Sequence, residues 1–452
     1  MSLRDRLEDV KNDAVLEPQG NQANGLMGNK VYQELRSRIH RKLLDRVDLS
    51  MMENMAPELL TTELKVLVER LLTEEAVAIN DVERMNLVRD IQHEVLGLGP
   101  LEILMADPTI SDILVNTYNQ IYIERKGKLE LSDVRFESEA HLLKIIDKIV
   151  SGVGRRVDES SPMVDARLPD GSRVNAIIPP LAVDGAILSI RRFAITPLMM
   201  KDLLHYKSLT PEMAEVLEGL VKAKVNILIS GGTGTGKTTL LNVLSGYIPE
   251  SERIITIEDA AELQLQQPHV VRLEIRPPNI EGKGEVTPRM LVRNSLRMRP
   301  DRIIVGEVRG PEVVDMLQAM NTGHEGSMAT VHANTPRDAL TRLENMMGMA
   351  GFNLPTKAMR EQISSALTAI VHITRLSDGQ RKVTNIKEIT GMESEIITMQ
   401  DIFVYEQTGV SDKGVVQGHL KATGIRPKFV ERLRVHGVQI SDSLFDPTKL
   451  YE

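Results

Sequence analysis

Cysteine and tryptophan are absent from the 452 residues of the chain, and aromatic residues make up only 3% of it. Without cysteine the chain can form no disulfide and no thiolate zinc or iron–sulfur site, and it suits a reducing compartment. The shortage of aromatic rings leaves few surfaces on which single-stranded nucleic acid could stack. A formal net charge of −8 also disfavours a nucleic-acid backbone as ligand. We therefore expect no bound zinc and no nucleic-acid partner.

Long apolar runs are missing as well. The start of the chain has no stretch that resembles a signal peptide, and no segment is long enough to span a bilayer. The hydrophobic fraction of 42% and the charged fraction of 26% are ordinary for a globular protein, and this length allows two or three domains. We expect a cytoplasmic protein that reaches a membrane only by docking on another protein.

The most informative stretch is Val225–Leu244, VNILISGGTGTGKTTLLNVL. It contains the Walker A spacing Gly-x-x-x-x-Gly-Lys-Thr, with an apolar strand expected before it and a helix from Thr239 after it. Glycines let the backbone turn its N–H groups toward phosphate oxygens, and the helix adds its positive end. A glycine loop that only turns a corner is the less favoured alternative. The predicted nucleotide-binding residues are Gly231, Gly232, Thr233, Gly234, Thr235, Gly236, Lys237, Thr238 and Thr239.

Within that loop two side chains have expected roles. Lys237 is placed to reach the β- and γ-phosphates, and Thr238 supplies a hydroxyl ligand for Mg²⁺. Hydrolysis also needs carboxylates, and two follow apolar segments at the ends of expected strands: Glu258 and Glu307. Glu307 is predicted to hold Mg²⁺ through water, and Glu258 to orient the attacking water. Asp301 lies before its strand, at the wrong end for this role.

Basic residues complete the predicted site. His332 follows the expected strand 327–331, where a neutral imidazole can sense the γ-phosphate, although a purely structural histidine is the commoner case. Arginine forks match phosphate oxygens and stabilise transition-state charge. Three arginines on strands of an upstream domain are candidates, provided that domain folds over the nucleotide: Arg173, Arg191 and Arg192.

The order of patterns along the chain predicts four segments. Residues 1–28 are expected to be a flexible leader, and 29–98 a three-helix bundle because apolar residues recur at helical spacing. Residues 99–196 alternate short strands with one helix, which indicates a small α/β domain. Residues 197–452 are expected to form the nucleotide-binding domain, a mostly parallel sheet with helices on both faces. Near its end we expect a hairpin, 370–376 with 381–389. The last residues, roughly 40 of them, are expected to be polar, with one helix at 429–435.

Taken together and in this order, four motifs resemble those of the secretion ATPases of type II and type IV systems. They are the Walker A loop, Ile257-Glu258-Asp259, Gly306-Glu307-Val308-Arg309 and Thr330-Val331-His332-Ala333-Asn334. The resemblance implies a homo-hexameric ring that uses ATP and Mg²⁺, with a PAS-like α/β domain before a RecA-like ATPase domain. It also assigns residues to the family's motifs: Glu258 and Asp259 to the Asp box, Glu307 to Walker B, His324 and His332 to the His box, and Arg173 with Arg191 or Arg192 to the arginines that reach the nucleotide.

Two further stretches, 154–175 and 296–307, look like the CpaF-type ATPases of tight-adherence (Flp) pilus assembly. In that branch a helical bundle precedes the PAS-like domain, and the zinc insertion of many related motors is absent. The implied function is a motor at the inner membrane that drives pilin assembly through platform proteins. The alternative is a type IV secretion or conjugation-type transport ATPase, which shares most of these motifs. A nucleic-acid motor and a nucleotide-gated module without turnover are the remaining rivals.

Overall fold

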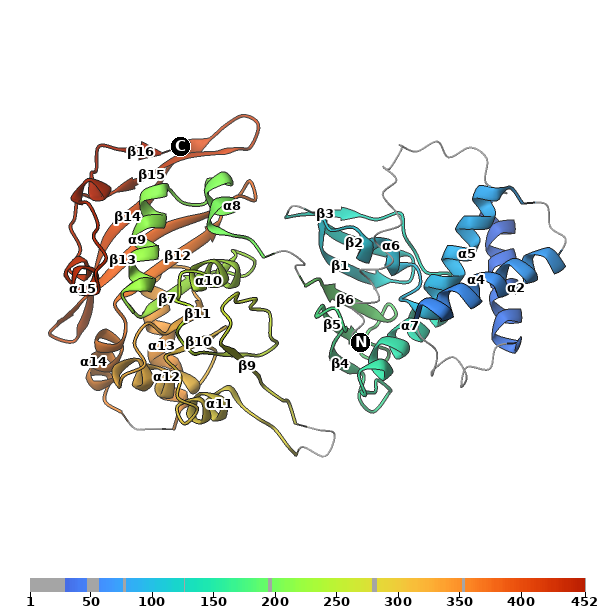
Figure 1. Cartoon of the computed structure of the whole chain (residues 1–452), viewed down its shortest axis with the longest axis horizontal. Helices are drawn as coiled ribbons and strands as arrows, with labels where there is room; N and C mark the ends of the chain where they lie inside the picture. The colour runs from blue at the N-terminus through green and yellow to red at the C-terminus, as the bar shows by residue number, and fades with distance from the viewer. Residues whose placement is uncertain are drawn as a thin grey trace. The chain divides into compact units, whose positions relative to one another are not determined.

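The computed structural model describes residues 29–46, 57–75, 79–125, 127–193, 197–278, 283–351 and 354–451. The chain divides into two units between Ile195 and Thr196, one residue from the expected start of the nucleotide-binding domain. Figure 1 shows the helices and strands of both units. The expected leader 1–28 lies outside the described residues. In the described part of the chain, no helix has both the length and the apolar character needed to cross a lipid bilayer.

The upstream unit begins with three helices that share one apolar core. Most of the apolar positions expected from the sequence face this core, which includes Leu35, Leu64 and Leu87. Val82 and Met85, expected to face it from the third helix, are exposed instead. The Asn80 side chain accepts a hydrogen bond from the Glu83 amide, and the Glu83 carboxylate accepts one from the Asn80 amide, so a capping box starts the third helix. The helices are α2 (Asn29–Arg46), α4 (Pro57–Glu74) and α5 (Asp81–Leu96).

A six-stranded antiparallel sheet follows, in the order β3-β2-β1-β6-β5-β4. One face packs against two helices around buried residues such as Ile113 and Ile190, because alternate residues of each strand point to the same side. The helices are α6 (Leu101–Ala106) and α7 (Glu139–Gly152). The strands are β1 (Ile110–Thr117), β2 (Gln120–Arg125), β3 (Lys128–Leu131), β4 (Met163–Arg167), β5 (Arg173–Ile177) and β6 (Ile187–Arg191).

Lys148 of α7 ties the sheet to the helices. Its Nζ donates to the carbonyl oxygens of Glu94, Val95 and Gly97 at 3.1, 2.9 and 2.6 Å, at the carboxyl end of α5. A cation at this end satisfies carbonyls that lack a partner within the helix. Burial lowers the pKa of Lys148, against the opposing charges of Glu94 and Glu102.

The downstream unit is built on a ten-stranded sheet in the order β16-β15-β14-β13-β12-β7-β11-β10-β8-β9. The six strands from β12 to β9 are parallel to one another, and the rest are antiparallel. The expected parallel sheet and hairpin are therefore present. Two strands were not expected: β14, which follows the hairpin, and β15, which lies within the expected polar tail. The parallel strands are β7 (Ile227–Gly231), β8 (Ile254–Glu258), β9 (Val270–Glu274), β10 (Arg302–Val305), β11 (Met328–His332) and β12 (Ala369–Arg375). The antiparallel strands are β13 (Arg381–Glu393), β14 (Ile396–Val410), β15 (Val416–Ala422) and β16 (Leu450–Tyr451).

Helices cover both faces of this sheet (Figure 1). Ile227 and Ile229 of β7 enter one core, and Leu228 between them enters the other, as the two-residue period of a strand requires. The helices that contribute to the first core are α8 (Met200–His205), α9 (Pro211–Lys222), α10 (Lys237–Ser245) and α15 (Phe429–Val435). Those of the second are α11 (Pro288–Ser295), α12 (Glu312–Asn321), α13 (Pro336–Met349) and α14 (Thr356–Ala366).

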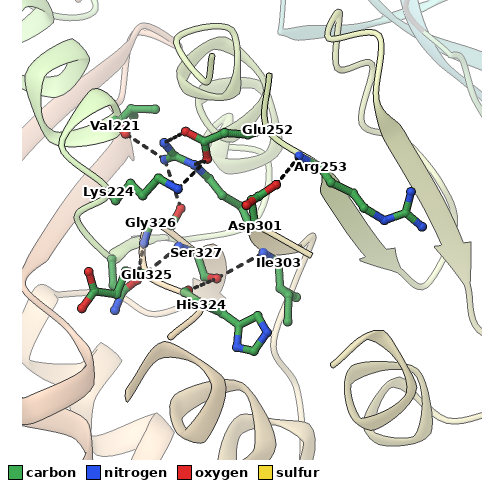
Figure 2. Close-up of polar contacts among 12 residues, drawn as sticks. Val221, Lys224, Glu252, Arg253, Asp301, Ile303, His324, Glu325, Gly326 and Ser327 are labelled. Atoms are coloured by element: carbon green, nitrogen blue, oxygen red, sulfur yellow. Dashed lines mark hydrogen bonds and ion pairs between the residues drawn. The ribbon is translucent and has the colours of Figure 1, made fainter. Parts of the chain in front are cut away.

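A fully buried arginine holds the amino ends of the parallel strands together (Figure 2). Arg302, at 0% exposure, forms a two-pronged ion pair with Glu252, with Nε–Oε2 at 2.7 Å and Nη2–Oε1 at 3.1 Å. Its Nη1 donates to the Val221 carbonyl at 2.8 Å. A Cβ on Gly326 would lie 2.7 Å from that same Nη1, so only glycine fits there. Although burial alone would raise the pKa of Glu252, Arg302 and Lys224 lower it overall.

We expect Arg302→Met to lower the free energy of unfolding by about 3–5 kcal/mol, because it removes the two-pronged partner of the buried Glu252 carboxylate and leaves it the Lys224 ammonium at 3.4 Å. Adding Glu252→Leu should restore much of the loss, since the poorly paired buried charge is then gone. Urea unfolding followed by circular dichroism measures both changes. Arg434→Met is the matched control, because Arg434 is exposed and pairs with exposed Glu431; it should change stability by less than about 0.5 kcal/mol. A single Arg302→Met variant as stable as the wild type would contradict this account.

Candidate functional site at the carboxyl ends of the parallel strands

The glycine loop, residues 231–238, joins β7 to α10 and is shaped by its neighbours. A Cβ on Gly231 would collide with the backbone carbonyl of Ile373 on β12 and with the Thr235 hydroxyl. Gly234 and Gly236 have φ angles of 69° and 99°, in the left-handed region that favours glycine. The loop therefore follows a path that larger residues at these three positions would block.

Lys237, at the start of α10, is held inside the loop. Its Nζ donates to the Gly232 carbonyl at 2.8 Å and lies 3.4 Å from Nδ1 of His332. Burial lowers the pKa of Lys237, while the charge of Glu307 opposes this shift. The lysine is thus fixed by the loop itself at the amino end of a helix, where anions bind.

The strand order brings the predicted residues His332, Glu307 and Glu258 to the same edge of the sheet. His332 is the last residue of β11 and pairs in register with Gly231. Glu307 follows β10, and its Oε1 lies 3.0 Å from Nε2 of His332. Burial lowers the pKa of His332 despite the opposing charge of Glu307, and Lys237 and Arg309 lower it further. The imidazole is therefore neutral at neutral pH.

Glu258 ends β8 and is only 4% exposed. Its Oε2 accepts hydrogen bonds from the amides of Glu262 and Leu263 at 2.7 and 2.8 Å. Its Oε1 is buried and has no hydrogen-bond partner among the described residues. Burial raises the pKa of Glu258, and the two amides offset this only in part. One carboxylate oxygen is thus fixed while the other is available to a ligand or water.

Arg309 is a site residue to which the sequence reasoning gave no role. Its guanidinium donates to Glu307 Oε2 at 2.6 Å and also to Asp259, so it links the segments after β10 and β8. Desolvation would lower its pKa, but these carboxylates raise it overall. Its position two residues after Glu307 could have suggested that it lies in the site. The sequence could not show that Asp259 lies beside it.

The other histidine of the expected His box lies elsewhere. His324 precedes β11 and His332 ends it, so the two are at opposite edges of the sheet. The carbonyl of His324 accepts a hydrogen bond from the Ser327 hydroxyl at 2.7 Å, at the same edge as Glu252 and Gly326 (Figure 2). Asp301 also lies at that edge, where it accepts from the Arg253 amide at 2.8 Å. Neither side chain belongs to the group around the glycine loop.

The three predicted arginines lie in the upstream unit, and their contacts there differ. Arg173 and Arg191 are cross-strand partners on β5 and β6, and Arg191 Nε donates to Asp112 Oδ1 at 3.1 Å. Arg192 lies just after the end of β6, and its Nη1 donates to the backbone carbonyls of Asp107 and Ile110. Burial lowers the pKa of Arg192. Through these contacts Arg192 stabilises its own unit. Arg173 and Arg191 are therefore the better candidates for contacting the phosphates of a nucleotide.

The chain belongs to the family of type II/IV secretion system proteins. The family model matches residues 94–425, which is more than half of the chain. A putative conjugal transfer protein of Mycobacterium tuberculosis is 38% identical over 324 residues, which cover 70% of this chain and 92% of that protein. The conjugal transfer protein TrbB of Rhizobium radiobacter is 33% identical over 68% of this chain and 90% of its own. The solved VirB11 ATPase of the Brucella suis type IV secretion system, in complex with sulphate, matches 64% of this chain and 92% of its own at 29% identity, with a TM-score of 0.35.

Gly231→Ala should weaken the binding of MgATP at least about tenfold, because its Cβ collides with the Ile373 carbonyl and must displace the loop. Gly232→Ala is the matched control. A Cβ there would meet only the Thr235 methyl group at 3.7 Å, an ordinary contact, so binding should stay within about twofold. Isothermal titration calorimetry on the two variants makes the comparison. Equal affinities would show that the close approach at Gly231 does not shape a nucleotide site.

Proposed function

We propose that the protein binds and hydrolyses ATP at the glycine loop and uses the energy to drive a type II/IV secretion machine. The observation that carries this proposal is the meeting of Lys237, His332, Glu307 and Glu258 at one edge of the sheet. The arrangement combines a cation for phosphate, oxygen ligands for a metal ion, and a buried carboxylate of raised pKa. These are the parts that hydrolysis of a phosphoanhydride requires.

Each residue has a distinct task in the proposed reaction. Backbone amides of the loop and Lys237 bind the phosphate oxygens. The Thr238 hydroxyl and the Glu307 carboxylate would hold Mg²⁺, which supplies charge neutralisation when bound; both are oxygen donors, the type this ion prefers. Glu258 orients the attacking water with its Oε1 and accepts its proton, for which a raised pKa is suited. Neutral His332, in contact with Glu307, reports on the γ-phosphate.

The transport class is the next level of the proposal. The relatives that match over most of their length are named for conjugal transfer, and one solved relative is a type IV secretion ATPase. They favour the alternative expected from the sequence, a type IV secretion or conjugation-type transport ATPase, over pilus assembly. We propose that the chain works in that setting as a homo-hexamer docked on inner-membrane proteins. Arg173 and Arg191, of the same or a neighbouring subunit, would then contact the phosphates when the ring closes.

A second candidate, assembly of tight-adherence pili through platform proteins, is favoured by one observation. The three helices that precede the sheet, α2, α4 and α5, lie almost wholly before the residues matched by the family model. A helical bundle at this place was expected for the CpaF-type branch. Cells carrying only an inactive variant separate the two candidates, since transfer of a conjugative element is lost in one case and surface pili in the other.

Glu258→Gln should lower kcat for ATP hydrolysis by about 100- to 1000-fold and leave the Kd for MgATP within about threefold, because the amide cannot take the proton from water. In the wild type, the activity should fall as pH falls through a carboxyl pKa above the usual value, since protonation removes the base. A phosphate-release assay from pH 5 to 9 measures both. Wild-type turnover by this variant would remove Glu258 from the reaction. A wild-type protein that binds ATP without turnover would indicate a nucleotide-gated module instead.

Arg191→Gln and Arg192→Gln should have different effects. Loss of Arg191 removes an exposed guanidinium, so kcat should fall at least about tenfold with an unchanged melting temperature, if this arginine contacts the phosphates. Loss of Arg192 removes the side-chain donor to the carbonyls of Asp107 and Ile110 and should lower stability by about 1–3 kcal/mol. Turnover and thermal melts of the two variants make the comparison. The assignment of Arg191 fails if its variant hydrolyses ATP normally.

A further inference from the structure

Two arginines of the β12–β13 hairpin lie beside the glycine loop. The proposed mechanism of ATP hydrolysis gives them no role. Arg375 ends β12, Arg381 begins β13, and the two are cross-strand partners. Arg381 Nε donates to the Gly234 carbonyl at 2.9 Å. A Cβ on Gly234 would lie 3.6 Å from Nη1 of Arg375. Both guanidinium groups therefore touch or nearly touch the same turn of the loop.

Arg381 has donor groups that can bind a ligand, and it faces a second positive charge. Like charges placed directly opposite each other on neighbouring strands repel and destabilise the pairing. Arg381 is exposed, and within the described ranges of the chain it contacts no carboxylate. Its hydrogen bond to the Gly234 carbonyl uses Nε and fixes the orientation of the guanidinium. The two Nη groups and the flat face remain for other contacts. An arginine held in this way is ready to bind a flat or anionic group.

The strand order indicates which end of a bound nucleotide would lie beside Arg375 and Arg381. β11 and β12 flank β7 on opposite sides. His332, Glu307 and Glu258 all lie on the β11 side, on β11 itself and after the strands beyond it. The γ-phosphate must face these groups, because hydrolysis occurs there. The chain of phosphates then runs across the loop, and the α-phosphate and nucleoside lie toward β12 and β13.

We propose that Arg375 and Arg381 form the nucleoside end of the site. Their guanidinium groups stack on the purine base and contact the ribose, in the same subunit that supplies the glycine loop. This inference rests on the proposed ATP site and adds the contacts that distinguish a nucleotide from a bare polyphosphate. Stacking between arginine and an aromatic ring contributes modestly and is stronger when water is excluded.

Calorimetry on the full-length protein with two ligands, MgATP and Mg-tripolyphosphate, tests the assignment. The second ligand has the phosphates but no nucleoside. Arg381→Ala should weaken MgATP binding by about 3- to 30-fold and leave tripolyphosphate binding within about twofold. Arg375→Ala should show the same selectivity. Arg381→Lys keeps the charge but loses the flat face, so it should reproduce most of the loss for MgATP.

Arg434→Ala is the matched control, because Arg434 is an exposed arginine on α15 that pairs with Glu431. Melting temperatures confirm that each variant folds; if Arg381→Ala does not fold, Arg381→Lys and Arg375→Ala carry the test. Equal losses for both ligands would overturn the inference, since the arginines would then serve the phosphates or the loop. Unchanged MgATP binding would overturn it as well. A wild-type protein that binds neither ligand would instead overturn the proposed ATP site itself.

Discussion

The close approach of two backbones at the end of β7 is the constraint on which the rest of the downstream unit depends. Gly231 lies so near the Ile373 carbonyl that no side chain fits between them, and this contact fixes where the loop leaves the sheet. The same register places His332 opposite Gly231 on the other side of β7. Because β12 leads directly into β13, the contact also brings Arg381 to the loop. One packing requirement thus sets the positions of groups far apart in the sequence.

The two edges of the parallel strands are built in opposite ways. At the amino edge, buried charge is satisfied: Arg302 has Glu252, Val221 and Gly326 as partners. At the carboxyl edge, Glu258 keeps one buried oxygen without a partner among the described residues, and Lys237 is bound only by the loop and His332. A buried polar atom without a partner costs free energy. At Glu258 the fold tolerates this cost, because a bound ligand would recover it.

Much of the site could be predicted because two general rules applied. The glycine spacing identifies the loop, and the carboxyl ends of parallel strands share one edge, which is why Glu258, Glu307 and His332 lie close together as expected. The sequence could not show which strand neighbours which, so Arg381 was read only as the start of a hairpin, and Arg309 was given no role. β14 and β15 were missed because polar residues, such as Gln400 and Asp401 on β14 and His419 and Lys421 on β15, disguise the alternation. Arg191 and Arg192 were treated as equivalent, because the sequence could not show that β6 ends at Arg191 and that Arg192 turns to backbone carbonyls.

The three carbonyl bonds of Lys148 have a mechanical consequence for the upstream unit. They fasten the end of α5 to α7, and α7 is packed on the sheet that carries Arg173 and Arg191. These bonds couple the end of α5 to the strands. A binding partner that displaced α5 would therefore also displace the strands that carry the two arginines.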